Sequence, residues 1–158
     1  MIAVRALREE DLEWVLELDR ETEWAPHWGE EVYRGYLEAD QRSGALRRFG
    51  LVAEMDGERA GVALGRLVLD GVENVCELEW IAVREALRRR GTGRALLEGV
   101  EGWAREHRGL RLILEVRAGN VGAQRLYRGL GWSETGRRRE YYREPMEDAV
   151  VMERLPGD

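Results

Sequence analysis

The hydrophobic residues change their spacing along this chain, and that change restricts the fold more than any other feature of the sequence. Three consecutive segments are rich in apolar side chains that do not follow helical spacing, which is typical of β-strands. The three predicted strands are Phe49–Met55, Arg59–Leu69 and Val75–Val83. Asp56-Gly57 joins the first two and is a strong signal for a two-residue hairpin. Before and after this region the apolar residues recur at helical spacing, so helices are expected to pack against the strands.

The other predicted elements complete an arrangement in which strands and helices are interleaved. The predicted helices are Asp11–Glu21, Glu30–Asp40, Gly91–Glu106 and Val121–Leu130, and the further strands are Ile2–Ala6, Leu110–Val116, Ser133–Tyr142 and Ala149–Glu153. This order, β-α-α-β-β-β-α-β-α-β-β, predicts the α/β class, with helices packed on a mixed sheet. The chain has 158 residues and no linker rich in proline, glycine or serine, which predicts one domain over residues 1–158.

The composition excludes several kinds of catalytic site. The chain has no lysine, which excludes both a Schiff-base lysine and the lysine of a Walker-type phosphate loop. Cys76 is the only cysteine, so an intramolecular disulfide and a multi-cysteine zinc site are excluded as well. The only two histidines, His27 and His107, are far apart in the sequence, and we therefore expect no metal site.

The sequence also restricts the cell compartment and the macromolecular partners. The N-terminus lacks the pattern of a signal peptide, and no segment is long and apolar enough to cross a membrane. We therefore expect a cytoplasmic protein without a membrane partner. The formal net charge of −6 argues against indiscriminate binding of nucleic acid, and no nucleic-acid partner is expected. The sequence makes no prediction of the oligomeric state.

The most informative segment for function joins the strand Val75–Val83 to the helix that follows it. From Arg84 to Arg94 there are five arginines and one glutamate, a local net charge of +4. Gly91 and Gly93 allow backbone N–H groups at the start of the helix to approach a ligand, and a helix N-terminus favours anions. A pyrophosphate group fits this combination, although a solvated basic turn that caps the helix has the same composition. A dinucleotide fingerprint is excluded because Leu96 occupies the third glycine position.

The pattern Arg88-x-x-Gly91-x-Gly93 resembles the pyrophosphate loop of the GNAT N-acetyltransferases, which bind acetyl-CoA. The resemblance implies the GNAT fold: a central mixed, mostly antiparallel sheet of about seven strands flanked by four helices. It also implies acetyl-CoA as cosubstrate and no metal. The residues that it assigns to acetyl-CoA are Ile81, Ala82 and Val83 along the pantetheine arm, and Arg88, Arg89, Arg90, Gly91, Thr92, Gly93 and Arg94 around the pyrophosphate.

The C-terminal third is similar to the RimI branch of this family, whose members acetylate the N-terminal amino group of a small-subunit ribosomal protein. The similar segments are 114–120 (LEVRAGN), 130–132 (LGW) and 137–142 (RRREYY). The resemblance implies that Glu115 is the general base, that Tyr127 is the general acid and that Asn120 contacts coenzyme A. It implies direct attack in a ternary complex, without an acyl-enzyme.

These residue types suit the chemistry, because an ammonium group must lose a proton before it attacks a thioester and the departing thiolate must gain one. Each has a structural alternative: Glu115 as an ion-pair partner on a strand, and Tyr127 as a core residue. Glu79 is the rival base, and we expect it on the same strand face as Glu77 and Ile81. Cys76, in the middle of a strand, is expected to pack rather than to act as a nucleophile.

The acceptor side is expected near the N-terminus, where residues 1–40 carry four arginines and twelve acidic residues. This local charge of −8 would attract a cationic acceptor, although acidic helices are often merely solvated. Trp28, Glu79 and Tyr141 are predicted to bind the acceptor, with Tyr142 as a further candidate wall and Trp24 expected to pack. Members of the branch often have Pro-Trp after the first helix, whereas here His27 lies between Pro26 and Trp28. A small-molecule amine acetyltransferase and a coenzyme A-binding protein without transferase activity are the alternative functions.

Overall fold

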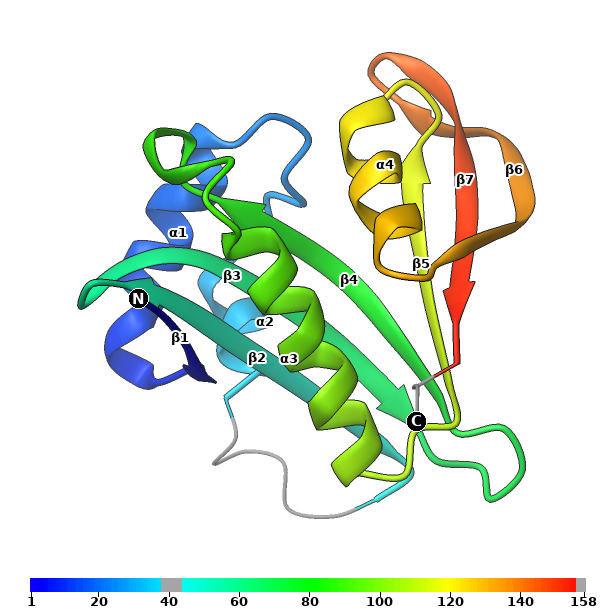
Figure 1. The fold of residues 1–158 in the computed structure, drawn as a ribbon, viewed down its shortest axis with the longest axis horizontal. Coiled ribbons are helices and arrows are strands. Elements are labelled where there is room, and N and C mark those ends of the chain that lie inside the picture. Colours follow the sequence, from blue (N-terminus) through cyan, green and yellow to red (C-terminus); the bar gives the residue numbers. More distant parts are fainter. Residues whose placement is uncertain (38–43, 156–158) are drawn as a thin grey trace.

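A seven-stranded sheet forms the centre of the protein (Figure 1), seen in a computed structural model that describes residues 1–37 and 44–155. The strands are β1 (Ile2–Ala6), β2 (Leu46–Met55), β3 (Glu58–Val68), β4 (Val75–Val83), β5 (Arg111–Arg117), β6 (Ser133–Arg143) and β7 (Met146–Arg154). The helices are α1 (Leu12–Glu21), α2 (Glu30–Arg34), α3 (Thr92–Glu106) and α4 (Val121–Gly129), with short 3-10 turns η1 (Glu9–Asp11) and η3 (Glu85–Leu87). The strand order is β1-β2-β3-β4-β5-β7-β6, and only β4 and β5 pair in parallel. This mixed, mostly antiparallel sheet with its four helices confirms the predicted fold class.

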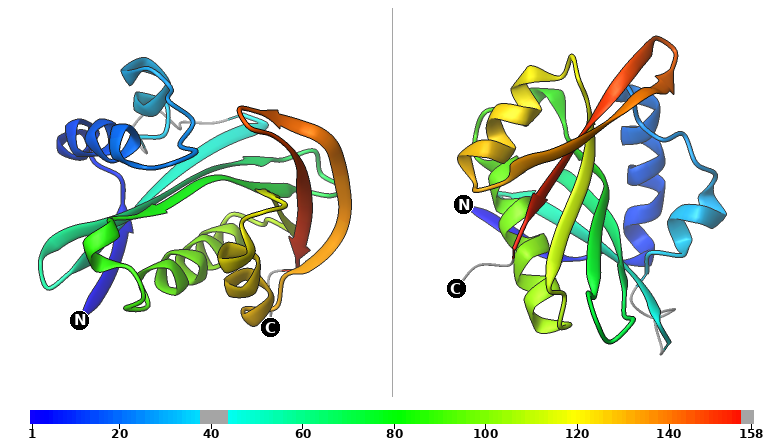
Figure 2. Two further views of the ribbon diagram at one scale, coloured as in Figure 1. Left: turned by 90° about the horizontal axis from the view of Figure 1, so that it is seen from above. Right: turned by 90° about the vertical axis from the view of Figure 1, so that its right-hand side faces the viewer.

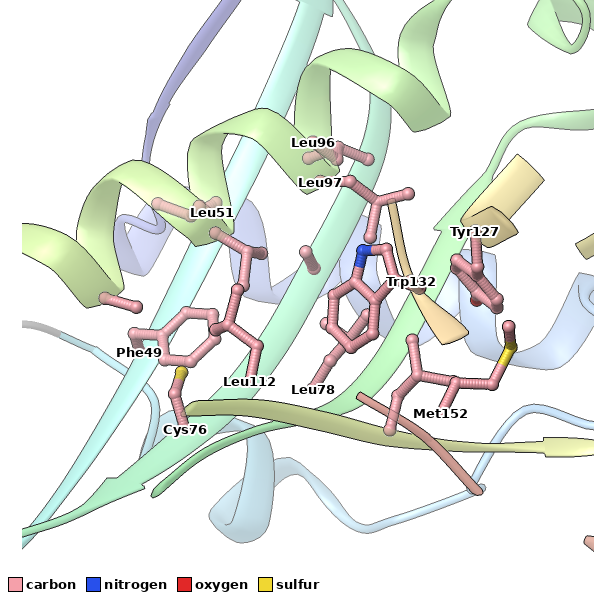
Figure 3. Packing of buried hydrophobic residues seen from close by; sticks show 14 of the residues in the cluster. Phe49, Leu51, Cys76, Leu78, Leu96, Leu97, Leu112, Tyr127, Trp132 and Met152 are labelled. Carbon is pink, nitrogen blue, oxygen red and sulfur yellow. The ribbon is translucent and has the colours of Figure 1, made fainter. Parts of the chain in front are cut away.

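The helices cover both faces of the sheet (Figure 2). Helices α3 and α4 lie on one face, where Leu96 and Val100 belong to a core that also contains Trp132 of the chain that follows α4 (Figure 3). Helices α1 and α2 lie on the opposite face, where Val15 and Tyr33 pack against a second group of buried residues. The sheet therefore separates two cores. A strand residue packs against α3 and α4 or against α1 and α2, depending on the face of the sheet to which its side chain points.

Several boundaries differ from the sequence-based prediction. The predicted helix Glu30–Asp40 ends at Arg34, and residues 38–40 lie outside the described residues. The N–H of Gly35 donates to the Val32 carbonyl at 3.1 Å, and this three-residue bond ends the helix by tightening its last turn. Strands β2 and β7 each begin three residues earlier than predicted, because backbone pairing continues past the apolar residues that marked them.

The Asp56-Gly57 hairpin is confirmed. Both residues have positive φ, 51° and 87°, as a two-residue hairpin turn with right-handed strand twist requires. The turn brings β2 and β3 into antiparallel register along their whole length apart from one irregularity at Ala53 and Glu54.

A short parallel contact and a β-bulge shape the middle of the sheet. Strands β4 and β5 pair only between Val75–Leu78 and Arg111–Leu114. Along β3, Leu64 pairs with Trp80 whereas Gly65 pairs with Leu78, so Glu79 is an extra residue in β4. The prediction that Glu77, Glu79 and Ile81 share a face is therefore wrong, because the bulge shifts the alternation: Ile81 packs in the α3–α4 core, and Trp80 packs in the α1–α2 core.

A buried carboxylate joins helix α1 to the sheet. Asp11 is 0% exposed and accepts hydrogen bonds from the Arg5 guanidinium at 2.7 and 2.9 Å, from Arg59 Nε at 2.7 Å and from the Arg8 N–H at 2.8 Å. Burial alone would raise the pKa of this carboxyl, but the hydrogen bonds from Arg5, Arg59 and Arg8 outweigh burial and lower its pKa from 3.8 to about 2. The ionised form of Asp11 therefore stabilises the start of α1 against β1 and β3.

The lowered pKa predicts how acid affects stability. Because the folded-state pKa lies below the unfolded value of 3.8, Asp11 contributes about 2 kcal/mol above pH 4, and that contribution is lost as the pH falls toward 2. Asp11→Asn should lower the free energy of unfolding at pH 7 by about 3 kcal/mol, because it leaves two guanidinium groups without their buried partner. The substitution should also make the free energy of unfolding less dependent on pH below pH 4, as measured by urea unfolding from pH 7 to 2. Asp56→Asn, at an exposed ion pair, is the control and should change little. Parallel curves for Asp11→Asn and wild type would contradict this role.

Candidate active site

A cavity of about 720 Å³ opens where β4 and β5 separate. Its lining comes from both strands, from the loop after α1, from the start of α4 and from the β6–β7 turn. It brings together five of the predicted site residues: Glu79, Ile81, Glu115, Asn120 and Tyr127. Beyond Leu78, β4 has no strand beside it on the β5 side among the residues that the structure describes, so its backbone borders this opening.

The other predicted site residues lie outside the cavity lining. Trp28 stacks on Tyr36 with ring centroids 6.0 Å apart and an interplanar angle of 6°. Tyr141 is 45% exposed and contacts the outer side of Glu115, while its neighbour Tyr142 lines the cavity. Adjacent residues of a strand point to opposite sides, so only one of these two tyrosines is expected to line the cavity. That residue is Tyr142. The remaining ones are Ala82 and Val83 at the end of β4 and the loop residues 88–94.

Two carboxylates face the opening from opposite strands. Leu78 and Leu114 are the last paired residues of β4 and β5, and each is followed by a glutamate. Glu115 forms an ion pair with Arg138, whose Nε lies 2.6 Å from Glu115 Oε2, and accepts a hydrogen bond from the Tyr141 hydroxyl at 3.3 Å. Both partners belong to β6 and lie outside the cavity lining. A carboxylate has about four acceptor sites, which leaves room for a bond on the cavity side.

Glu79 is a partly desolvated carboxylate. Burial raises its pKa above the usual 4.5, while the hydrogen bond from Tyr36 and the charge of Arg66 act in the opposite direction. The Tyr36 hydroxyl donates to Glu79 Oε1 at 2.9 Å, and Tyr36 is itself buried against Trp28. Trp28 therefore supports the residue that orients Glu79.

Helix α4 supplies the groups on the other face of the opening. Asn120 caps the helix, since its Oδ1 accepts the Ala123 N–H at 3.2 Å. Tyr127 lies on the buried side of α4 with its ring 6.1 Å from that of Trp132 (Figure 3). Burial raises the pKa of the Tyr127 phenol well above its usual 10, so the hydroxyl carries its proton at neutral pH.

The basic loop lies between the end of β4 and α3. Gly91 has φ of 89°, a left-handed conformation that glycine adopts without strain, and α3 starts at Thr92. The N–H groups of residues 92–94 precede the first intrahelical bond, which runs from Ala95 to Gly91. The Thr92 side chain is buried, whereas Arg88, Arg89, Arg90 and Arg94 are exposed. Gly93 lies against Leu126 of α4, so the loop adjoins the α4 side of the opening.

Comparison with known proteins decides the family. A model of the Acetyltransferase (GNAT) family matches residues 8–132. The chain belongs to the GNAT acetyltransferase family. It is 31% identical over 150 residues to a Bacillus subtilis protein named "Putative ribosomal protein bS18-alanine N-acetyltransferase", an alignment that covers 95% of this chain and 93% of that protein.

Solved structures of GNAT proteins have the same fold. The crystal structure of the ribosomal-protein-S18-alanine N-acetyltransferase from Escherichia coli matches with a TM-score of 0.79 and 29% identity, covering 100% of this chain and 96% of that one. Arabidopsis thaliana NAA60 in complex with acetyl-CoA matches with a TM-score of 0.83 over 98% of both chains, and its 19% identity supports the fold alone. The predicted resemblance to GNAT proteins of the RimI branch is thus confirmed.

Sequence reasoning missed three residues of this GNAT site: Arg117 and Trp24 line the cavity, and Tyr36 lies outside the cavity lining and bonds Glu79. Arg117 and Tyr36 gave no signal, because their contacts come from segments far away in the chain. Trp24 was expected to pack, but it lines the cavity and is 44% exposed. Its position after α1 and its exposure become meaningful only when the fold places that loop over β5.

Cys76, the only cysteine of the chain, lies outside the cavity lining. Cys76 is fully buried, and burial raises the pKa of its thiol to about 12, which confirms a packing role. Within residues 1–37 and 44–155, no cluster of three or more histidine, cysteine, aspartate or glutamate side chains is arranged to hold a metal ion. No helix in the same ranges is long and apolar enough to cross a membrane.

The hydrogen bond from Tyr36 to Glu79 predicts a site-specific pKa change. Tyr36→Phe removes a donor to the ionised form of Glu79, so the pKa of Glu79 should rise further. Carboxyl-carbon NMR titration of Glu79 measures this shift directly. Tyr33→Phe is the matched control, since Tyr33 donates to Asp19 at 2.6 Å instead, and it should leave the titration of Glu79 unchanged. An unaltered Glu79 pKa in Tyr36→Phe would show that the bond does not tune this carboxyl.

Proposed function

We propose that this protein, as one domain over residues 1–158, transfers the acetyl group of acetyl-CoA to the N-terminal α-amino group of a protein. The observation that carries the proposal is the placement of Glu115 and Tyr127 on opposite faces of one opening. Glu115 faces the side of the loop after α1, and Tyr127 comes from α4 on the other side. In one ternary complex, Glu115 can therefore contact the acceptor amine from one side while Tyr127 contacts the leaving thiolate from the other.

The basic loop suits the phosphates of acetyl-CoA. Its exposed arginines supply positive charge, and the N–H groups of residues 92–94 point out of the N-terminus of a 15-residue helix. The edge of β4 at Ile81–Val83 leads from this loop into the cavity and suits the pantetheine arm, with Asn120 at the cavity wall. When bound there, acetyl-CoA supplies an electrophilic thioester carbonyl.

The protein's own groups then handle two protons and one charge. Glu115 accepts a proton from the acceptor ammonium, directly or through a water molecule, which frees the amine to attack. A backbone N–H of β4 near Ile81 donates to the carbonyl oxygen as negative charge develops on it. The Tyr127 hydroxyl gives its proton to the departing thiolate, and the second proton that the attacking nitrogen loses as the amide forms restores the Tyr127 phenol. No residue of the protein forms a covalent bond with the acetyl group.

The acceptor side of the cavity is suited to a cation. Four carboxylates line the cavity, those of Glu23, Glu79, Glu115 and Glu144. Glu79 attracts the ammonium group, while Trp28 and Tyr141 position Glu79 and Glu115 from behind. The acceptor is the N-terminus of a ribosomal protein in the cytoplasm, in keeping with the names of the Bacillus and Escherichia relatives.

The transfer reaction predicts a clear division between acceptors. Purified protein with acetyl-CoA should acetylate a peptide that begins with alanine at its α-amino group, detected by mass spectrometry and by release of free thiol. Glu115→Gln should lower kcat by about 10²- to 10⁴-fold and leave the Kd for acetyl-CoA unchanged, because a general base contributes about that much. Glu79→Gln should mainly raise the KM for the peptide. Turnover of polyamines without peptide, or full activity in Glu115→Gln, would overturn the proposal.

The basic loop predicts a salt-dependent cosubstrate affinity. Replacing Arg89 and Arg90 together by alanine should raise the Kd for acetyl-CoA about tenfold or more at low salt, with a smaller ratio in 0.5 M salt, because exposed charges are screened. Calorimetry measures both values. The control replaces Arg137 and Arg139, which lie on β6 away from this loop. An equal loss of affinity for acetyl-CoA in the two double variants would show that the net charge of the protein, and not the position of these arginines, determines binding.

A further inference from the structure

The Arg117 side chain is enclosed between two aromatic rings at the acceptor end of the cavity. Its guanidinium carbon lies 5.1 Å from the centre of the Trp24 ring and 4.3 Å from the centre of the Tyr142 ring. The side chain is 11% exposed, and all three residues line the cavity. Cations over aromatic faces attract more strongly when they are shielded from water, as here.

Two polar contacts fix the same guanidinium to a third part of the chain. Its Nη1 donates to the Pro145 carbonyl at 3.1 Å and lies 3.3 Å from Glu147 Oε1. These partners belong to the β6–β7 turn and the start of β7. Arg117 on β5 thus connects the loop after α1, through Trp24, with the β6–β7 hairpin, through Tyr142, Pro145 and Glu147.

The loop that carries Trp24 contacts β5 through the Arg117 guanidinium. Trp24 has φ of 62° and His27 has φ of 56°, conformations that are unfavourable for residues other than glycine. His27 is held by the buried Asp19, whose Oδ1 accepts the His27 N–H at 3.2 Å. The Trp24 side chain is 44% exposed, and the Arg117 guanidinium covers its ring. The Arg117 guanidinium, which lies between the Trp24 and Tyr142 rings, therefore sets the distance between them.

We propose that Arg117 is a specificity-determining residue that keeps the two sides of the acceptor opening at a fixed separation. The inference rests on the proposed function. With Trp24 and Tyr142 held against one planar group, the opening admits the end of an extended chain whose first side chain is small, and it excludes a bulky first side chain. Lysine cannot replace arginine here, because an ammonium group retains the charge but not the flat surface that contacts both rings.

The test compares Arg117→Ala and Arg117→Lys with the same changes at Arg111. Arg111 lies on the same face of β5, six residues away, and pairs with Glu153 at 2.6 Å outside the cavity. Two peptides that differ only in the first residue, alanine or leucine, serve as acceptors. Arg117→Ala should reduce the preference in kcat/KM for alanine at least fivefold, Arg117→Lys should reduce it less, and the Kd for acetyl-CoA should stay unchanged. The Arg111 variants should keep the wild-type preference.

Hydrogen exchange gives a second readout that does not depend on activity. Amides of residues 22–29 and 143–147 should exchange about tenfold faster in both Arg117 variants, and those of the Arg111 variants should not. If an active Arg117→Ala variant keeps the wild-type preference for alanine, or if amide hydrogen exchange in these segments is unchanged, the proposed role of Arg117 is overturned while the proposed function stands. A wild-type protein that acetylates neither peptide overturns the proposed function, and the specificity role with it.

Discussion

The four-residue parallel contact between β4 and β5 is the constraint on which the rest of the site depends. Longer pairing would close the middle of the sheet and leave no place for a cavity. Because pairing stops at Leu78 and Leu114, the two strands separate, and β4 keeps an open backbone edge. The bulge at Glu79 acts at the same point, since it turns the carboxylate toward the α1–α2 face while Ile81 returns to the α3–α4 core. One irregularity thus places an acidic group on one side of the opening and an apolar surface on the other.

The two faces of the opening differ in charge in a way that the net charge hides. The N-terminus of α3 and the four exposed arginines of its loop lie next to α4. Carboxylates from β4, β5, the loop after α1 and the β6–β7 turn line the cavity itself. An acidic chain of net charge −6 can therefore bind a polyanionic cosubstrate and a cationic acceptor at the same time. The absence of lysine has a further consequence, since such an enzyme has no ε-amine of its own to acetylate.

Local signals explain which features were predictable from the sequence. The Asp56-Gly57 hairpin, the helix after the glycine loop and the order of strands and helices along the chain follow from short-range patterns. The family resemblance assigned Glu115 and Tyr127 to one site, and both line the cavity. The bulge at Glu79 depends on how β4 aligns with β3, which no periodicity in β4 alone reveals. The contacts of Tyr36 and Arg117 were hidden for the same reason. Tyr36 bonds Glu79, which lies 43 residues away in the sequence, and Arg117 contacts Trp24 in the loop after α1. The end of α2 at Arg34 could not be predicted either, because the apolar residues Tyr36 and Leu37 continue the helical spacing beyond it.

The most direct test of this account is a crystal structure of the protein with a bisubstrate ligand, in which coenzyme A is joined through an acetyl group to a peptide that begins with alanine. The account predicts that the pyrophosphate lies at the N–H groups of residues 92–94 and that the pantetheine follows the open edge of β4. It predicts that the linking carbonyl lies in the cavity between Ile81 and Tyr127, with the peptide leaving past Glu115 between the loop after α1 and the β6–β7 turn, beside the Arg117 guanidinium. A ligand bound outside the opening between β4 and β5, or a peptide that leaves on the α4 side, would contradict it.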